Sequence, residues 1–277
     1  MNPAERALWF VESHFAQDIS LDEVAAVGGV SRYHMTRAFA AATGMSVIAY
    51  AKARRLSEAA KKLSHGAPDI LTVALEAGYG SHEAFTRAFR DQFGLTPEQL
   101  RGGRILDIVQ LVEPIAMNDT PPNALKPPRI ETGKTLLIAG LSERYTHASS
   151  AAIPSQWQQF QPHIGHVPGQ IGNVAYGVFY NTDDSGNMDY MTGVEVADFS
   201  DLPKTFARLR VPQHLYAVFA HEGHISTIRG TMNAIWNSWL PQSEYEAADA
   251  PGFERYDAKF DPHSGLGGFE IWIPVKK

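Results

Sequence analysis

The chain of 277 residues is long enough for two domains of ordinary size, and its 44% apolar content permits sizeable cores. The net charge is −6. The absence of cysteine excludes disulfides and thiolate metal sites. No apolar run reaches roughly 18 residues, which excludes a membrane-spanning helix. The N-terminus shows no basic region followed by a long apolar stretch, so we expect no signal peptide and a cytoplasmic protein.

Two stretches fifty residues apart share one pattern. They read SRYHMTRAFAAATG from Ser31 and SHEAFTRAFRDQFG from Ser81, and both fit Ser-x4-Thr-Arg-Ala-Phe-x4-Gly. Serine suits the N-cap of a helix, and glycine suits the residue beyond its C-terminus. Gly28 and Gly78 precede the two stretches, where a tight turn would lie. Each stretch is therefore predicted to be the second helix of a helix-turn-helix unit that occurs twice.

The first half of the chain is predicted to be helical throughout. Ser20 and Glu23 form a capping-box pattern at the start of the second helix. The expected helices cover residues 3–17, a segment from 21, 31–43, 46–64, 70–77, 81–93 and 97–100. The helix over 46–64 is amphipathic and connects the two units.

The N-terminal part of the second helix of such a unit enters the major groove of DNA. The residues expected to be exposed there are Arg32, Tyr33, Thr36 and Arg37 in the first unit, and His82, Glu83, Thr86 and Arg87 in the second. Arginine can donate paired hydrogen bonds to guanine, and glutamate can accept one from the cytosine amino group. For the two arginines at the repeat positions, pairing with carboxylates or phosphates is the alternative.

The charge divides unevenly along the chain. Residues 1–104 hold 12 Lys and Arg against 11 Asp and Glu, whereas residues 105–277 hold 12 against 19. Phosphate contacts require local rather than overall positive charge, and local clusters occur at Arg54-Arg55, Lys61-Lys62, Arg87 with Arg90, and Arg101 with Arg104. Double-stranded DNA is thus the expected partner of the first part, with salt-sensitive affinity.

The second copy resembles the AraC/XylS family of transcription regulators. The matching residues are Val73-Ala74, Gly78-Tyr79, Ser81, Phe85, Arg87, Phe89, Phe93-Gly94-Leu95-Thr96-Pro97 and Arg101. The first copy is looser, with Gly29 where the family usually has an aromatic residue and Val47 where proline is common. The resemblance covers residues 4–104. It implies an all-α DNA-binding domain with two helix-turn-helix units, and it places base contacts at the positions named above.

Prolines mark the boundary that follows. They are Pro114, Pro121, Pro122, Pro127 and Pro128. Such a run cannot form a continuous helix or a central strand, so an extended linker is expected. The predicted division is a DNA-binding domain over 1–108, a linker over 109–127 and a second domain over 128–277. The two halves are expected to fold separately, without a shared core.

The second half is predicted to be a duplicated strand-helix-strand-strand unit. The expected elements are a strand over 135–144, a helix over 153–164 and strands over 174–181 and 188–196, then a strand over 205–209 and 215–222, a helix over 226–240 and strands over 253–260 and 269–275. Alternation places Tyr176, Val178 and Tyr180 on one side of their strand and Phe179 on the other. The predicted fold class is therefore multidomain, with an all-α double helix-turn-helix domain followed by an α+β domain.

Several phrases of this half resemble the GyrI-like effector-binding domain. They are Ile153-Pro154-x2-Trp157, Tyr176-Gly177-Val178, Tyr190-x2-Gly193-Val194-Glu195-Val196, Val211-Pro212-x3-Tyr216-Ala217-Val218-Phe219-x3-Gly223, Ile235-Trp236-x2-Trp239-Leu240-Pro241, Phe253-Glu254-x-Tyr256-Asp257 and Glu270-Ile271-Trp272-Ile273-Pro274-Val275. The resemblance implies two units side by side that cradle a small molecule. An AraC-type domain followed by this one resembles the Rob-like arrangement.

Aromatic side chains stack on flat or cationic ligands, and a buried carboxylate neutralises a cation. The predicted ligand-binding residues are Trp157, Tyr176, Tyr190, Tyr216, Trp236, Glu254 and Glu270. For the two glutamates, the alternative is a solvent-facing position on an edge strand; the resemblance places ligand-contacting acids at both. The expected effector is amphipathic or aromatic, and neutral to cationic.

No catalytic residue, cofactor or metal site is predicted. His221-Glu222-Gly223-His224 lacks the HExxH spacing, and residues 180–187 lack the closing Glu of a calcium loop. The leading function is a ligand-responsive transcription regulator. The alternatives are a GyrI-like hydrolase of strained-ring or xenobiotic compounds tethered to DNA, and a DNA-bound protein-recruiting module without ligand. RNA polymerase is a candidate partner, and both a monomer and a dimer stay open.

Overall fold

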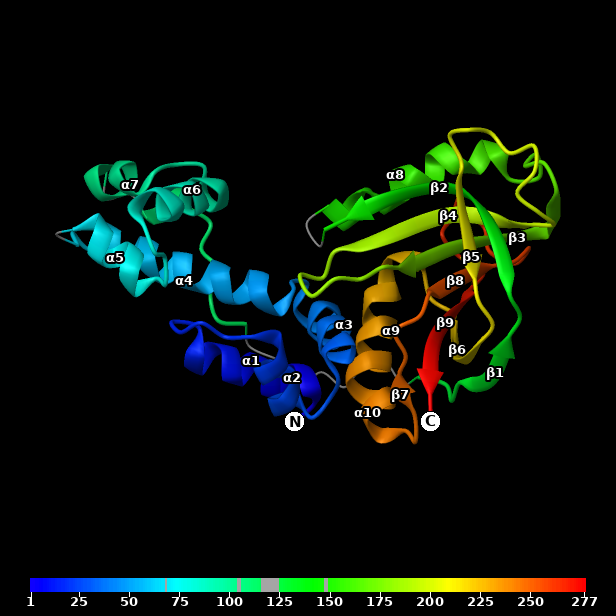
Figure 1. Ribbon diagram of the computed structural model, residues 1–277, viewed down its shortest axis with the longest axis horizontal. Coiled ribbons are helices and arrows are strands. Elements are labelled where there is room, and N and C mark those ends of the chain that lie inside the picture. The colour runs from blue at the N-terminus through cyan, green and yellow to red at the C-terminus, as the bar shows by residue number, and fades with distance from the viewer. Residues whose placement is uncertain (68, 104–105, 116–124, 147–148) are drawn as a thin grey trace.

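The computed structural model describes residues 1–67, 69–103, 106–115, 125–146 and 149–277. Figure 1 shows a helical domain (residues 1–115) and a sheet domain (residues 125–277) that meet where α3 lies beside α9. The predicted fold class, an all-α domain followed by an α+β domain, is confirmed. Arg104 of the expected basic cluster, and Pro121 and Pro122 of the expected linker, lie outside the described residues.

The helical domain contains the predicted pairs of helices. They are α1 (Pro3–His14), α2 (Leu21–Gly28), α3 (Arg32–Thr43), α4 (Val47–Ser64), α5 (Ile70–Glu76), α6 (His82–Phe93) and α7 (Pro97–Gly103), followed by the 3-10 turn η1 (Leu106–Ile108). Ser31 and Ser81 cap α3 and α6, and Gly44 and Gly94 end them with φ of 80° and 73°. In the first unit the left-handed turn residue is Gly29, with φ of 70°, because Gly28 still belongs to α2.

Helix α4 separates two small apolar cores, one for each helix-turn-helix unit. Residues beyond η1 pack back onto it: the Val112 amide donates to Ser57 Oγ at 2.9 Å, and Arg54 Nη1 donates to the Val112 carbonyl at 3.0 Å. Val109 is buried in the core of the second unit. The segment expected to begin the linker therefore packs against the helical domain as far as Ile115, whose amide donates to Tyr50 Oη.

The sheet domain repeats one unit twice. Its elements are β1 (Arg129–Gly133), β2 (Leu136–Tyr145), α8 (Ile153–Phe160), β3 (Gln170–Tyr180) and β4 (Met188–Val196), then β5 (Ala207–Val211), β6 (His214–His221), α9 (Ile228–Ala234), the π-helical turn η5 (Ile235–Trp239), α10 (Leu240–Gln242), β7 (Glu246–Ala247), β8 (Gly252–Tyr256) and β9 (Phe269–Lys276). The sequence predicted neither β1 nor β7, and it predicted one continuous helix where α9, η5 and α10 follow one another.

The sheet order is β1-β6-β9-β8-β3-β4-β2-β5. Strands β1, β2, β3 and β4 of the first unit correspond to β5, β6, β8 and β9 of the second. Exchanging each strand for its equivalent reverses the order, so the sheet has an approximate two-fold symmetry. The units meet at β3 and β8, and each unit's first strand pairs with the second strand of the other unit, β1 with β6 and β5 with β2. Tyr176, Val178 and Tyr180 face one side of the sheet and Phe179 the other, as predicted. Both helices of the repeat pack on the Phe179 side.

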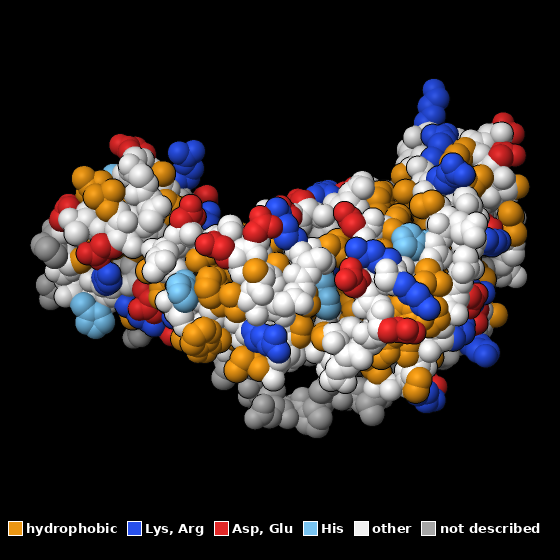
Figure 2. Space-filling model, turned by 60° about the horizontal axis from the view of Figure 1, so that its bottom comes forward, with side chains coloured by type: hydrophobic (Ala, Val, Ile, Leu, Met, Phe, Trp, Pro, Cys, Tyr) orange, Lys and Arg blue, Asp and Glu red, His pale blue; other side chains and the backbone are white. Residues whose placement is uncertain are grey.

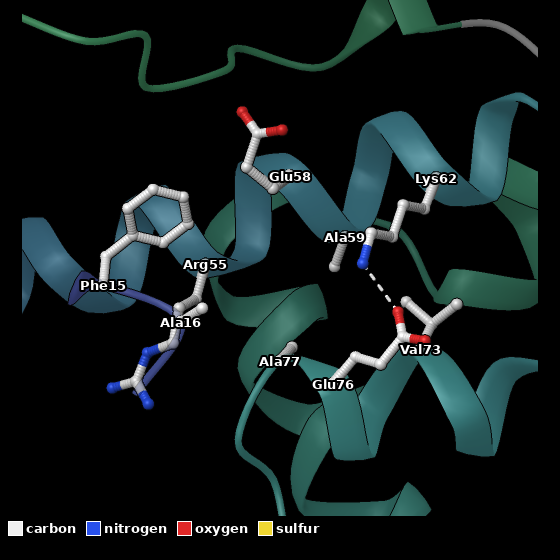
Figure 3. Close-up of a pocket in the computed structure, with 9 residues that line it drawn as sticks. All are labelled: Phe15, Ala16, Arg55, Glu58, Ala59, Lys62, Val73, Glu76 and Ala77. Carbon is white, nitrogen blue, oxygen red and sulfur yellow. Dashed lines mark hydrogen bonds and ion pairs between the residues drawn. The ribbon is translucent and has the colours of Figure 1, made fainter. Parts of the chain in front are cut away.

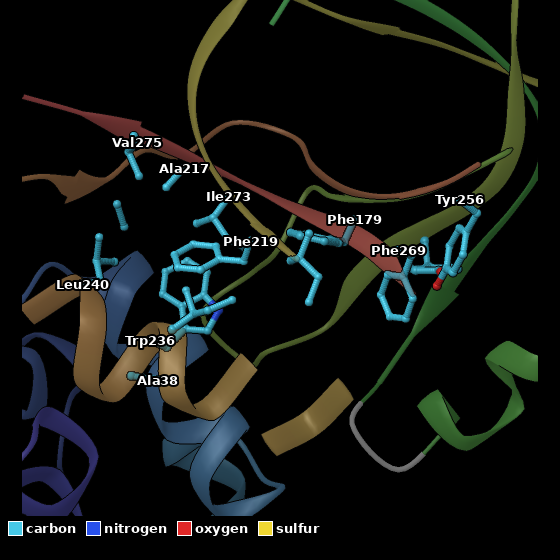
Figure 4. Close-up of a cluster of buried hydrophobic side chains, with 14 of the residues drawn as sticks. Ala38, Phe179, Ala217, Phe219, Trp236, Leu240, Tyr256, Phe269, Ile273 and Val275 are labelled. Atoms are coloured by element: carbon cyan, nitrogen blue, oxygen red, sulfur yellow. The ribbon is translucent and has the colours of Figure 1, made fainter. Parts of the chain in front are cut away.

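The two domains share a core. Figure 4 shows Ala38 of α3 beside Trp236 and Leu240, in a cluster that continues through Phe219 and Phe179 of the sheet. The expectation that the halves share no core is therefore wrong. The cause is the small side chain of Ala38 on α3, which lets the helix approach the fully buried Trp236.

Two glycines permit a close approach of the backbones of the paired strands β2 and β4. Gly140 and Gly193 face each other in register, and a Cβ on Gly140 would lie 2.0 Å from the Thr192 carbonyl oxygen. No side chain has room there without displacing a backbone.

We expect Gly140→Ala to lower the free energy of unfolding by at least about 3 kcal/mol, because overpacking against backbone cannot be relieved by a rotamer change. Thermal or urea unfolding of the full chain measures the loss. Gly80→Ala is the control, since a Cβ there meets nothing within 4 Å. Equal stability of the two variants would contradict the close approach of the two backbones.

Candidate DNA-reading helices and ligand site

Helix α6 presents two of its four predicted DNA-reading residues to solvent. Glu83, Arg87 and Arg90 are exposed, and they line an open depression with His82 and Thr86. His82 Nε2 lies 2.9 Å from Glu98 Oε1. Exposure is thus confirmed for Glu83 and Arg87, whereas His82 and Thr86 are half-buried and the Thr86 hydroxyl is buried; base contact by these side chains stays a prediction.

Other basic clusters of the helical domain are largely neutralised. Arg54 is buried and pairs with Glu12 and Glu58 at 2.9 and 3.1 Å, and Lys62 pairs with Glu76 at 2.6 Å. In contrast, Arg87 and Arg90 make no ion pair with a residue that the structure describes. Figure 2 shows acidic and basic side chains interleaved on one face of the molecule. Arg87 and Arg90 of α6 are thus exposed cations that no described carboxylate neutralises.

Helix α3 differs from α6 although the two share the repeat. Thr36 is only 4% exposed, and Arg37 donates to Thr182 Oγ1 of the β3–β4 turn. Arg32, which alone of its set is exposed, pairs with Asp22 and with Asp184 of the same turn. The expectation that this face is exposed is wrong for three of its four residues.

Aromatic contacts complete this arrangement. Tyr33 meets Trp236 edge-on with ring centroids 6.1 Å apart, and the Arg37 guanidinium lies 5.1 Å from the centre of the Phe179 ring. His34 Nε2 donates to the Trp236 carbonyl at 2.7 Å, and burial lowers the pKa of this imidazole. The sheet domain covers the face of α3 on which base readers were predicted. Their role at DNA stays a prediction.

A small hollow of about 60 Å³ lies elsewhere on the helical domain, between α4, α5 and the residues after α1. Figure 3 shows Arg55, Glu58, Lys62 and Glu76 at its edge, with Lys62 and Glu76 paired across it. Its volume is far below the roughly 300 Å³ at which drug-sized ligands begin to fit. It is therefore not the ligand site.

Glu254 lies at the centre of a hydrogen-bonded aromatic group on the helix-covered side of the sheet. Tyr190 Oη donates to Glu254 Oε2 at 2.6 Å and Tyr256 Oη donates at 3.0 Å, while Trp157 Nε1 donates to Tyr190 Oη at 3.0 Å. The space comes from Gly177, where a Cβ would lie 2.1 Å from Tyr190 Oη. We call this group, with Phe269 against Tyr256 at 4.7 Å, the Glu254 site.

Electrostatics favour a cation at the Glu254 site. Burial raises the pKa of the Glu254 carboxyl above its usual range, and the two tyrosine hydroxyls only partly offset this. The same carboxylate helps to raise the pKa of Tyr190 well above its ordinary value. No described cation pairs with Glu254, although it and Trp157 keep partial solvent exposure. A ligand cation could therefore supply the missing countercharge.

Glu270 lies on the opposite side of the sheet. It pairs with Arg129 at 2.8 Å and Arg255 at 3.5 Å, and it accepts from Trp272 Nε1 at 3.0 Å. Its charge is thus already neutralised. The structure places Tyr176 and Tyr216 in the core on this opposite side, and it places Trp236 against α3.

Of the seven predicted ligand residues, three come together: Trp157, Tyr190 and Glu254. The sequence reasoning omitted Tyr256 and Phe269. Tyr256 had a signal, because it lies two residues after Glu254 and strand alternation puts both on one face. Phe269 had none within its own strand.

Among the described residues, no group of three or more His, Cys, Asp or Glu side chains could hold a metal ion. No described helix has the length and apolarity that crossing a membrane requires.

Residues 126–276 match the family of GyrI-like small molecule binding domains, and residues 24–103 match a helix-turn-helix domain. Nearly the whole chain is similar to the Right origin-binding protein of Escherichia coli (strain K12), with 26% identity over 283 residues, 98% of this chain and 96% of that protein. The Transcriptional regulator Rob of Salmonella typhimurium shows 26% identity over 284 residues, with the same shares of both chains. The Transcriptional regulator BrlR of Pseudomonas aeruginosa shows 29% identity over 152 residues, 53% of this chain and 54% of that protein.

The family match spans more than half of the chain, and the relatives similar over nearly its whole length are named for origin binding and transcriptional regulation. The chain therefore belongs to the GyrI-like small molecule binding family, and it carries an AraC-type helix-turn-helix domain ahead of the GyrI-like domain, in the Rob-like arrangement of DNA-binding transcription regulators.

Proposed function

We propose that this protein is a cytoplasmic transcription regulator that reads DNA through its helical domain and responds to an amphipathic or aromatic cation bound at the Glu254 site. The observation that carries the proposal is the partly buried carboxylate of Glu254, which has two tyrosine donors but no described countercharge. Its counterpart Glu270 has two arginines. Burial of an uncompensated carboxylate is costly, so a site that retains one is suited to a cation.

The DNA side of the proposal is supported by α6. Its Arg87 and Arg90 are exposed and free of described ion pairs, and its N-terminal turn carries His82 and Glu83. Two recognition helices in one chain suit an asymmetric site that spans two successive major-groove segments. A single protomer would then suffice for sequence-specific binding.

We expect Arg87→Ala to weaken binding to a duplex selected by the protein from a random library by about 1–3 kcal/mol, because paired hydrogen bonds to a guanine are lost. Binding to random duplexes should fall much less. Fluorescence anisotropy at fixed salt measures both. Arg208→Ala, an exposed arginine on β5, is the matched control. An equal loss on selected and random DNA would assign Arg87 to phosphate contact alone.

We expect Glu254→Gln to weaken tetraphenylphosphonium binding by tenfold or more, about 1.4 kcal/mol, because the ligand loses its countercharge. Tetraphenylborate, which has the same shape and the opposite charge, should bind the wild type poorly and gain from the substitution. Titration calorimetry measures both ligands. Glu270→Gln is the control, since its carboxylate faces the other side of the sheet and is already paired. Preference of the wild type for the borate would overturn the assignment.

The same site predicts a pH dependence. Because the Glu254 pKa is raised, its carboxylate becomes protonated before that of an ordinary glutamate as the pH falls. Cation affinity should therefore be full above the raised pKa and decline as the pH falls through it. Calorimetric titrations over a pH series measure the decline, which Glu254→Gln should abolish. Affinity independent of pH would indicate that the carboxylate does not contact the cation.

A further inference from the structure

The face of α3 predicted to read bases is held by the sheet domain through side chains from two elements. From the β3–β4 turn, Thr182 accepts from Arg37 and Asp184 pairs with Arg32. Met188 Sδ lies 3.6 Å from Arg37 Nη1. Every predicted base reader of the first unit is either covered by this domain or paired with it.

The second element is the π-helical turn η5. Pro241 cannot donate the helical hydrogen bond expected at its position, and the preceding turn widens to the π form. Within this turn Asn237 faces the helical domain: its Nδ2 donates to the Ala38 carbonyl at 2.8 Å, and its Oδ1 accepts from the Ala4 amide at 3.2 Å. Trp236 packs on Tyr33 beside it. A turn of unusual geometry thus supplies the side chains that hold α3.

This contact and DNA compete for the same surface. The major groove is about 12 Å wide and admits one helix, whose diameter with side chains is about 10–12 Å. No room is left for η5 and the β3–β4 turn on the side of α3 that would face the bases. The first unit cannot read DNA while the contact persists, whereas α6 of the second unit is free.

The contact leaves polar atoms without partners. Five buried side-chain nitrogen or oxygen atoms have no hydrogen-bond partner among the described residues, and three belong to this contact: Tyr33 Oη, Arg37 Nε and Trp236 Nε1. Buried polar groups in permanent cores are normally satisfied. Release of α3 would give all three atoms access to water or, for those on α3, to DNA. Such a contact suits an exchangeable state.

The contact also borders the Glu254 site. Arg37 stacks on Phe179 of β3, which lies opposite Gly252 of β8. Two residues earlier on the same face of β3, Gly177 lies opposite Glu254. The Arg37 guanidinium and a cation at Glu254 would thus share one face of the sheet, above positions of β3 that are two residues apart. Like charges on the same partly buried face repel each other more strongly than they do in water.

We propose that the sheet domain acts as an internal competitor of DNA, holding the reading face of α3 through η5 and the β3–β4 turn. A cation at the Glu254 site repels Arg37 and favours release of α3. The inference rests on the proposed function, and it adds the means by which ligand and DNA binding are coupled. The unliganded protein meets DNA with α6 alone, and both helices engage after release.

The first test weakens the contact from the sheet domain only. The full chain with Thr182→Ala, Asp184→Lys and Asn237→Ala keeps every predicted DNA-reading residue and the whole Glu254 site. A duplex is first selected from a random library with the wild type and with this variant. The variant should bind the selected duplex at least tenfold more tightly than the wild type does. Asp249→Lys, an exposed residue with the same charge change, controls for general attraction to phosphate. Affinity no greater than that of this control would overturn the inference.

The second test locks the contact. The chain has no cysteine, and an ideal Cβ on Gly186 lies 3.0 Å from Ser46 Cβ. Ser46→Cys with Gly186→Cys can therefore form a disulfide if the turn shifts to the usual Cβ–Cβ distance of about 3.8 Å. Gly186 has φ of 78°, so its replacement also strains the backbone. With tetraphenylphosphonium present, the oxidised chain should bind the selected duplex much more weakly than the same sample after reduction, because only the reduced chain can release α3. Oxidised and reduced forms that bind equally would refute the inference.

The third test addresses coupling. Tetraphenylphosphonium should raise specific DNA binding of the wild type and leave both the weakened-contact variant and the oxidised disulfide variant unchanged. These measurements distinguish failure of the proposed function from failure of the internal competition. If no variant distinguishes selected from random DNA, the proposed function fails. If the wild type is sequence-specific but the cation, the weakened contact and the disulfide change nothing, only the internal competition fails.

Discussion

The packing of Trp236 against α3 is the interaction on which the arrangement of the two domains depends. This indole is 1% exposed and lies against Tyr33 and His34 on one side and the sheet core on the other. Without it, the shared core would lose its largest fully buried side chain. With it, two helix-turn-helix units of similar sequence acquire different surroundings. The asymmetry of the molecule thus begins at one tryptophan.

The energetics of this contact are close to balance. Its neutral cross-domain hydrogen bonds, at His34 and Asn237, contribute about 1 kcal/mol each. The charged donor Arg37 contributes about 1.5–3 kcal/mol through Thr182, and the exposed pair of Arg32 with Asp184 contributes at most about 1 kcal/mol. Three buried polar atoms without described partners cost about 1–3 kcal/mol each, which offsets these gains. The net stabilisation must come from apolar burial around Trp236. A contact held mainly by burial, with polar groups left unpaired, can be exchanged for a polar partner such as DNA.

Local sequence signals predicted what depends on neighbouring residues, and little else. Ser31, Ser81, Gly44 and Gly94 act through bonds within one turn, so the repeat identified both recognition helices correctly. The ligand site was harder, because Glu254 and Glu270 look alike in their own strands. The pairing of β8 with β9, in which Arg255 lies opposite Glu270, decides which face of the sheet each glutamate lies on and which residues surround it. A register cannot be deduced from either strand alone, since a slip of one residue exchanges the two faces.

The docking of α3 has a sequence signal that the repeat itself contains. After the shared Arg-Ala-Phe, α3 continues with Ala40, Ala41 and Ala42, whereas the same positions of α6 are Arg90, Asp91 and Gln92. Alanine lets another helix approach closely, and Ala41 packs at the edge of the shared core. Charged and amide side chains at those positions favour solvent, and Arg90 is exposed. A helix that met only DNA phosphates at this end would gain from basic residues there, and α6 carries one in Arg90. The loss of every charge from the same turn of α3 is what a second, apolar partner requires, and the sheet domain is that partner.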